Sequence, residues 1–197
     1  MAHGKEQKTI AKNTIFLYMR MIVVMFVSLY TSRVVFDKLG IENYGIYNIV
    51  GSVVISFAFI KNALQSATQR FLSYSKGANT VPSSSVFSMS MNIHLLIMLI
   101  VFVLLETVGL WFFYNVINIP DSRIESARIV YQFSAITFCV NLVQVPYISL
   151  IVSNERMSVY AILSVAEVIL KLLIAYALTV TDSFDKLILY GFLMMKN

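Results

Sequence analysis

The chain alternates between long apolar runs and short polar segments. The apolar runs cover about 14–36, 44–60, 86–113, 124–152 and 158–180, and a last run covers 187–197. A helix that crosses a bilayer needs roughly 20 apolar residues, so the first five runs suit crossings and the last is incomplete. Backbone polar groups in lipid must be satisfied within the helix, and these runs lack the alternation of barrel strands. We therefore expect an all-α polytopic membrane protein.

Polar breaks separate these runs. The segment "GIENYG" (40–45) lies between the first two runs, "GANTVPSSS" (77–85) precedes the third, and Pro120 precedes the fourth. Ser122 and Glu125 have the spacing of a capping box at the start of the fourth helix. The expected organisation is a single transmembrane domain over 1–197, with five helices and the start of a sixth.

The second run ends in a polar tail, "NALQSATQRFLSYSKG" (62–77). A continuous helix over 44–76 would be about 50 Å long, whereas the hydrocarbon layer is about 30 Å thick. The excess is expected to project toward the cytoplasm and to form the mouth of a cavity. The side chains expected at water are Asn62, Gln65, Ser66, Gln69, Arg70 and Ser73, and those expected to pack are Ala63, Ala67, Phe71 and Tyr74.

Composition supports a membrane location. Hydrophobic residues make up 58% of the 197 residues and charged residues 13%, against roughly 25% charged residues in soluble domains. The one cysteine, Cys139, excludes a disulfide within the chain and a Cys-rich metal site. The sequence contains no phosphate-binding loop, catalytic motif or paired metal-ligand spacing. We therefore expect no catalytic residue, cofactor or metal, and no nucleic-acid partner.

The distribution of Lys and Arg predicts the orientation. With the N-terminus inside, inner segments contain seven such residues and outer segments five, and cytoplasmic loops favour positive charge. A cytoplasmic N-terminus is expected. The inner residues are Lys5, Lys8, Lys12, Lys61, Arg70, Lys76 and Arg156, and the outer ones are Arg33, Lys38, Arg123, Arg128 and Lys186.

Four ionisable residues lie well inside apolar runs: Arg20, Glu106, Glu167 and Lys171. Each costs roughly 2.5 to 3.5 kcal/mol at the bilayer centre and therefore needs a partner or a cavity. Glu167 and Lys171 are four residues apart on one helical face, which Tyr160 and Ser164 extend. They form either a self-neutralised pair or part of an ion-coupling cavity wall. Arg20 either lines the cavity or extends its head to the inner interface.

Two further residues, His94 and Pro146, are candidates for a functional role. His94 precedes Glu106 by about 18 Å of helix, so the two are not an acid–base pair, and His94 is interpreted as an interface residue. Pro146 lies inside the fourth run and removes a helical hydrogen bond to Leu142. Its kink is either a static bend or a hinge. The polar residues around it are Asn141, Gln144 and Tyr147.

Four segments carry a family resemblance: "SLYTSRVVFDKLGIENYGIYNIVG", "ALQSATQRFLSYSKG", "VYQFSAITFCVNLVQVPY" and "SNERMSVYAILSVAEVILKLLIAY". From about Lys12 onward the chain resembles the polysaccharide and O-antigen (lipopolysaccharide) flippases of the MOP superfamily, which are MATE-like. The resemblance implies a two-lobed transporter that moves undecaprenyl-diphosphate-linked sugars across the bacterial inner membrane by alternating access. This chain would supply the N-terminal lobe, opposed by a C-terminal lobe or a second copy.

The resemblance also implies a cationic central cavity that receives the lipid diphosphate. By position it assigns Arg20, Arg33 and Arg70 to this cavity, with Gln65 and Gln69 beside them. Guanidinium groups offer paired donors to phosphate oxygens. Glu106 and Glu167 would bind a coupling ion, H⁺ or Na⁺, or neutralise their neighbours.

Two other functions are alternatives. A multidrug or metabolite antiporter of the same superfamily would share the fold and the ion coupling. A membrane-embedded glycosyltransferase would use Asp37 and Glu42, which lie in the first outer loop. We favour the simpler interpretation of these two carboxylates as solvated charges that flank a turn.

Overall fold

The computed structural model describes residues 2–78, 81–117 and 119–180. These residues form α1 (Ala2–Ile55), α2 (Ala58–Ala78), α3 (Ser83–Leu104), α4 (Leu110–Asn115), α5 (Ile124–Ser153) and α6 (Met157–Val180). A π-helical turn, η1 (Leu105–Gly109), joins α3 to α4, and a 3₁₀ turn, η2 (Asp121–Arg123), precedes α5. The described residues include no strand. The all-α prediction is confirmed, and the last run, 187–197, lies outside the described residues.

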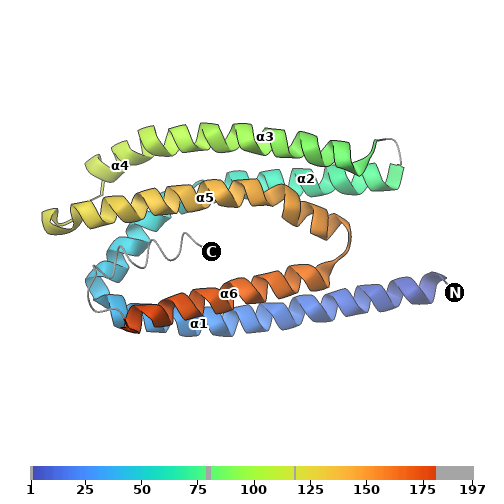
Figure 1. The fold of residues 1–197 in the computed structure, drawn as a ribbon, viewed down its shortest axis with the longest axis horizontal. Coiled ribbons are helices and arrows are strands. Elements are labelled where there is room, and N and C mark those ends of the chain that lie inside the picture. Colours follow the sequence, from blue (N-terminus) through green and yellow to red (C-terminus); the bar gives the residue numbers. More distant parts are fainter. Residues whose placement is uncertain (1, 79–80, 118, 181–197) are drawn as a thin grey trace.

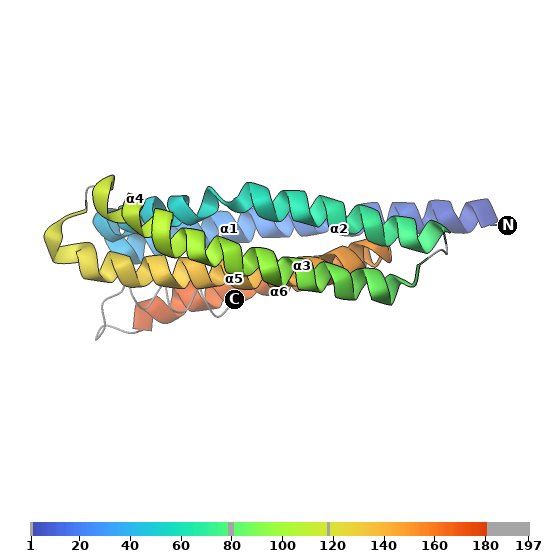
Figure 2. The same ribbon diagram turned by 90° about the horizontal axis from the view of Figure 1, so that it is seen from above.

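The helices form two layers (Figures 1 and 2). The long first part of α1 lies against α6, while α2 and α3 both pack on α5 in the second layer. The chain passes from the first layer to the second within α1, and the part of α1 after Gly40 contacts α5. It returns to the first layer at the turn between α5 and α6.

Among the described residues, four stretches are long and apolar enough to cross a bilayer: Ala11–Ile55, Ser83–Asn115, Asp121–Ser153 and Met157–Tyr176. Their mean hydropathies are 1.7, 2.6, 1.9 and 2.0. Large apolar side chains such as Phe26 and Ile162 lie on the outside of the bundle, where lipid would cover them. The chain is therefore a polytopic membrane protein.

The buried core lies toward one end of the bundle. It joins the second part of α1, the η1 and α4 region and α5 as far as Leu142, and it includes Val50, Leu105, Phe113, Tyr131 and Leu142. Each of these side chains is at most 1% exposed. The core therefore lies mainly within the second layer, whereas open space lies between the two layers.

A kink at Gly40 divides α1. Its backbone has φ 76° and ψ 169°, a region that is nearly restricted to glycine. The predicted first two runs, 14–36 and 44–60, correspond to the two parts of this helix. The predicted break over 40–45 is reduced to one non-helical residue, because helical hydrogen bonding resumes directly after it.

The prediction of one continuous helix over 44–76 is wrong. α1 ends at Ile55, a turn occupies 56–57, and α2 begins at Ala58. The Phe57 N–H bonds to the Val54 carbonyl three residues back, and the Ser56 hydroxyl donates to the Ser52 carbonyl. Serine hydroxyls that bond to nearby backbone favour bends over regular helix. The segment 44–76 therefore belongs to two helices, the end of α1 and most of α2.

The predicted packing face of α2 is also wrong. Thr68, Leu72 and Ser75 are buried. The Ser75 hydroxyl donates to the Val81 carbonyl, which satisfies this buried polar group. The buried face of α2 therefore consists of two hydroxyl side chains and one leucine. It is covered because α2 contacts both α5 and α3. The residues expected to pack are instead exposed or only partly covered: Ala63, Ala67, Phe71 and Tyr74.

The predicted capping box at Ser122 and Glu125 is not formed. Ser122 lies inside η2, and Arg123 occupies the N-cap position of α5 without a side-chain cap. The Arg123 N–H bonds instead to the Pro120 carbonyl at 2.8 Å. Because the 3₁₀ turn shifts the helix start by one residue, the Ser122 hydroxyl is out of register with the amides that it was expected to cap.

The turn between α5 and α6 connects both layers. Glu155 has a positive φ of 56°, and the Glu155 and Arg156 N–H groups bond to the carbonyls of Val152 and Ile151. This is the Schellman pattern that commonly ends helices. Asn13 donates to the Glu155 carbonyl at 3.2 Å, and Lys76 donates to the Ser153 carbonyl at 3.4 Å. Side chains from α1 and α2 therefore meet at this turn.

Candidate functional site

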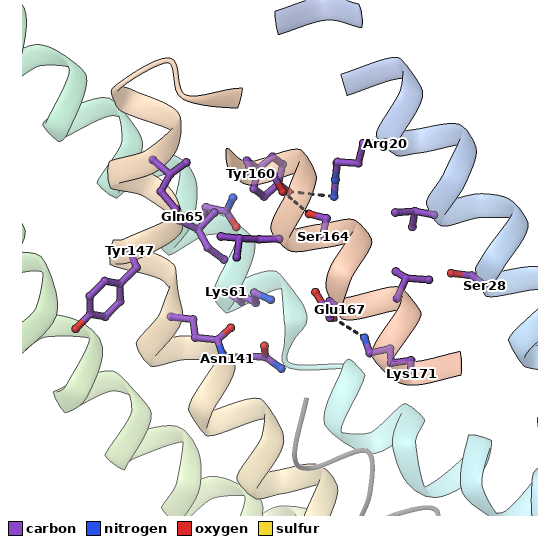
Figure 3. Close-up of a pocket in the computed structure, with 16 residues that line it drawn as sticks. Arg20, Ser28, Lys61, Gln65, Asn141, Tyr147, Tyr160, Ser164, Glu167 and Lys171 are labelled. Carbon is purple, nitrogen blue, oxygen red and sulfur yellow. Dashed lines mark hydrogen bonds and ion pairs between the residues drawn. The ribbon is translucent and has the colours of Figure 1, made fainter. Parts of the chain in front are cut away.

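A cavity of about 670 Å³ lies between the two layers. Four helices contribute to its wall, α1 and α6 from one layer and α2 and α5 from the other (Figure 3). The cavity lies outside the buried core, and many of its lining side chains are polar. The polar and charged lining residues are Arg20, Ser28, Lys61, Gln65, Asn141, Gln144, Tyr147, Tyr160, Ser164, Glu167 and Lys171.

The formal charge of the lining is positive. Among the described lining residues, Arg20, Lys61 and Lys171 contribute three positive charges and Glu167 contributes one negative charge, which gives +2. Lys171 pairs with Glu167 at 2.5 Å, with side chains 36% and 48% exposed. The predicted pair is confirmed, and it lines the cavity. In the described part of the chain, neither Arg20 nor Lys61 forms an ion pair.

Arg20 reaches across from α1 to α6 (Figure 3). Its guanidinium carbon lies 4.4 Å from the centre of the Tyr160 ring, and its Nη2 lies 3.3 Å from the Tyr160 hydroxyl. A cation over an aromatic face is attracted by the ring quadrupole. The Nε atom is buried and has no partner among the described residues. This geometry favours the cavity interpretation of Arg20 over extension to the interface.

The structure separates the predicted binding residues. Arg20 and Gln65 line the cavity, whereas Arg33, Gln69 and Arg70 are not among its described lining residues, and their assignment to a binding cavity stays a prediction. Arg33 is exposed thirteen residues beyond Arg20, about 20 Å further along α1. Arg70 is exposed and lies about 140° around α2 from Gln65. Gln69 is partly buried.

Sequence reasoning did not assign Lys61, Ser28 and the polar residues of α5 to the site. Lys61 is four residues before Gln65 and therefore shares its helical face, a spacing that was available in the sequence. The sequence shows Asn141, Gln144 and Tyr147 only as neighbours of Pro146. Their place in the cavity wall depends on how α5 packs, which has no local signal.

Pro146 is buried within α5, which remains helical from Ile124 to Ser153. The side chains of Gln144 and Tyr147, on either side of this proline, line the cavity. The Tyr147 ring also packs edge-on against Phe87 of α3, with centroids 5.3 Å apart. A bend at Pro146 would therefore move part of the cavity wall, and its role as a hinge stays a prediction.

Glu106 lies outside the cavity, in η1. One carboxylate oxygen accepts a hydrogen bond from the Gln132 amide at 3.2 Å, and the other is buried without a partner among the described residues. Glu106 is thus an amide-paired carboxylate between α3 and α5. Its proposed role in ion coupling stays a prediction.

His94 is buried within the bundle, with 1% exposure, and its interpretation as a residue at the membrane interface rather than a proton relay stays a prediction. Its Nδ1 lies 2.7 Å from the Ser90 carbonyl, and its Nε2 has no partner in the described residues. α3 packs on both α2 and α5, which explains why a histidine near its middle is covered.

The remaining acidic residues give no sign of a metal site. Among the described residues, no group of three His, Cys, Asp or Glu side chains lies close enough to hold a metal ion. Asp37 and Glu42 are both exposed on either side of the Gly40 kink, as expected for solvated charges that flank a turn.

The observed arrangement is thus a polar, positively charged cavity inside an apolar bundle. No family model, curated protein or solved structure matches the chain, and its function is therefore inferred from this cavity and from the resemblance of its sequence segments.

Proposed function

We propose that the chain is one lobe of a flippase that moves lipid-linked oligosaccharide precursors across the bacterial inner membrane. The observation that carries this proposal is the cationic cavity between the two helix layers. Charged groups inside a membrane protein are expensive and usually mark a substrate or ion pathway. A cavity lined by three positive charges, one negative charge and several amides suits a ligand that carries both phosphate and hydroxyl groups.

The lining residues supply two kinds of recognition. Arg20 and Lys61 would contact phosphate oxygens, and the guanidinium offers paired donors in a fixed geometry. The attraction is stronger at low dielectric than in water. Gln65, Asn141 and Gln144 offer amide donors and acceptors for sugar hydroxyls. These groups bind and orient a ligand but perform no bond chemistry.

The Glu167–Lys171 pair provides a means of ion coupling. While Glu167 is ionised, it neutralises Lys171. A proton or a sodium ion on the carboxylate would release Lys171 and make the cavity more positive by one charge. Binding of a coupling ion and of an anionic ligand would then favour each other. The opposing cavity wall would come from a C-terminal lobe or a second copy, and the N-terminus would be cytoplasmic.

The proposal is tested by genetic complementation. A strain that lacks the gene should accumulate lipid-linked repeat units on the cytoplasmic face and lose surface polysaccharide. The double variant Arg20→Ala, Lys61→Ala should restore less than about a tenth of wild-type export, because it removes both unpaired cations and each lost charge contact to phosphate costs a factor of ten or more. Arg70→Ala is the matched control, since it removes an exposed charge outside the cavity and should restore export fully.

Membrane levels of each variant are measured beside export. Normal surface polysaccharide in the deletion strain would contradict the proposal, and so would full export by the double variant.

An antiporter of the same superfamily is the second candidate, favoured by the partly exposed Glu167 carboxylate in the cavity. It predicts dye efflux from proteoliposomes under an ion gradient, abolished by Glu167→Gln. The flippase predicts no dye efflux in the same vesicles.

A further inference from the structure

A second depression, of about 370 Å³, follows the contact between α1 and α6. We call it the seam groove. Except for Arg20, its lining is entirely apolar. The lining residues are Phe16, Met19, Arg20, Val23, Ala161, Ile162, Val165, Ala166 and Ile169.

The seam groove and the cavity lie on different faces of α6. Tyr160, Ser164 and Glu167 line the cavity, whereas Ile162, Ala166 and Ile169 line the groove. Between these two faces, Ala161 and Val168 are buried, with 5% and 8% exposure. A packed seam therefore separates the two spaces.

Among the described residues, Arg20 is the one that lines both spaces. Its guanidinium is held over the Tyr160 ring, and its buried Nε has no partner in the described part of the chain. Its one hydrogen bond to a described residue is the long contact to the Tyr160 hydroxyl at 3.3 Å. A planar cation with unused donors thus lies where a polar cavity meets an apolar groove.

Arg20 contacts α6 near the start of that helix. α6 begins at Met157, so Tyr160 lies in its first turn, about 5 Å from the helix end. This end of the bundle carries the N-terminal part of α1 (Figure 1). Charged lipid headgroups lie near helix ends, and hydrocarbon lies deeper. From Arg20, the α6 side of the groove continues deeper along the helix to Ile169.

We propose that the seam groove holds the hydrocarbon chain of the lipid carrier, with the carrier phosphate on Arg20 and the sugar in the cavity. The identity of the carrier rests on the proposed function. A free phosphate would use Arg20 but would leave the apolar groove unexplained. An uncharged lipid would use the groove but would leave the Arg20 donors unsatisfied.

The chain contains a natural comparison surface. A groove of about 490 Å³ between α3 and α5 is also apolar, and it has no charged lining residue. Lipids that merely surround the protein should occupy both grooves. A lipid recognised through its phosphate should prefer the seam groove. Residues of the comparison groove include Phe102, Ile136, Val140 and Val143.

The test uses the full chain in phosphatidylcholine nanodiscs with a trace of polyprenyl phosphate that carries a photoactivatable group on its chain. Cross-linked residues are mapped by mass spectrometry. Because a charge-assisted phosphate contact favours one groove, we expect about fivefold more labelling at Ile162 and Ala166 than at Ile136 and Val140. Arg20→Gln should remove this excess, whereas Arg33→Gln, an exposed change on the same helix, should not.

A second pair of variants keeps all charges. Ala166→Phe fills the seam groove from an exposed position and should lower labelling of that groove several-fold. Val140→Phe makes the same kind of change in the comparison groove and should not. Equal labelling of both grooves would overturn the proposal. Equal competition by phosphatidylglycerol and unlabelled polyprenyl phosphate would also overturn it, because the groove would then select phosphate lipids in general.

The two proposals fail in different ways. If the deletion strain accumulates lipid-linked units but both grooves label equally, the seam groove is overturned and the flippase stands. If the seam groove labels selectively but the deletion strain exports normally, the flippase is overturned and the lipid site stands.

Discussion

At the residue scale, the contact between η1 and α5 depends on one glycine. The Tyr131 hydroxyl donates to the Leu105 carbonyl at 2.7 Å. It also occupies the position that a Cβ on residue 109 would take, so only Gly109 leaves room for it. Single π-helical turns inside α-helices commonly mark functional positions. Glu106 lies in this turn and is therefore placed by the same contact.

Gly109→Ala should destabilise the chain by about 1–3 kcal/mol, because the added methyl group overlaps the Tyr131 hydroxyl in a packed core. Thermal unfolding in detergent measures this effect. Tyr131→Phe alone should cost about 1 kcal/mol through the lost hydrogen bond. The double variant should be more stable than the sum of the two effects predicts, since removing the hydroxyl relieves the overlap and leaves the ring carbon 3.3 Å from the added methyl group.

Gly51→Ala serves as the control for Gly109→Ala. Nothing lies within 4 Å of a Cβ at this position, so its effect should be small. Strict additivity of Gly109→Ala and Tyr131→Phe would count against the contact. The sequence shows both residues but not their approach, because they are on different elements.

At the element scale, the Gly40 kink directs α1 from one layer to the other. Gly40→Ala should destabilise the fold by about 1–3 kcal/mol, since the backbone conformation there is nearly restricted to glycine. The melting temperature in detergent should fall accordingly. Gly45→Ala is the matched control in the same helix, because it lacks a positive φ and has open space around its Cβ. A straightened α1 without loss of stability would contradict this account.

The elements also show where pattern reasoning succeeds and fails. The third, fourth and fifth runs correspond to α3–α4, α5 and α6, because a long apolar run determines a helix locally. The second run predicted one continuous helix over 44–76, which is wrong because the hydroxyls of Ser52 and Ser56 bond to backbone carbonyls near the end of α1. The predicted packing face of α2 is wrong because the helices that contact α2, and not its own composition, decide which of its sides is buried.

At the scale of the whole molecule, the cavity should be accessible to water although the bundle surface is apolar. Gln65→Cys should react rapidly with a polar, membrane-impermeant thiol reagent, because this side chain lines the cavity. The natural Cys139 is buried, with 7% exposure, and should react slowly. Labelling is followed by a mass shift in sealed vesicles of known orientation, with faster reaction expected from the cytoplasmic side.

Phe26→Cys is the matched control for this labelling. Phe26 is 63% exposed in the bundle but lies on its apolar surface, where lipid suppresses formation of the reactive thiolate. Equal reactivity at positions 26 and 65 would mean that the cavity is no wetter than the lipid-facing surface.

The sequence by itself determined the all-α membrane fold, the approximate helices and the Glu167–Lys171 pair. Each depends on residues that are close in the chain: run length for the helices and a four-residue spacing for the pair. Tertiary structure alone decided which charges share the cavity. Arg20 contacts Tyr160 across 140 residues of sequence, whereas Arg33 and Arg70 are not among the described lining residues. Contacts between residues that are distant in the sequence depend on how the two layers pack, and this packing depends on all the helices together.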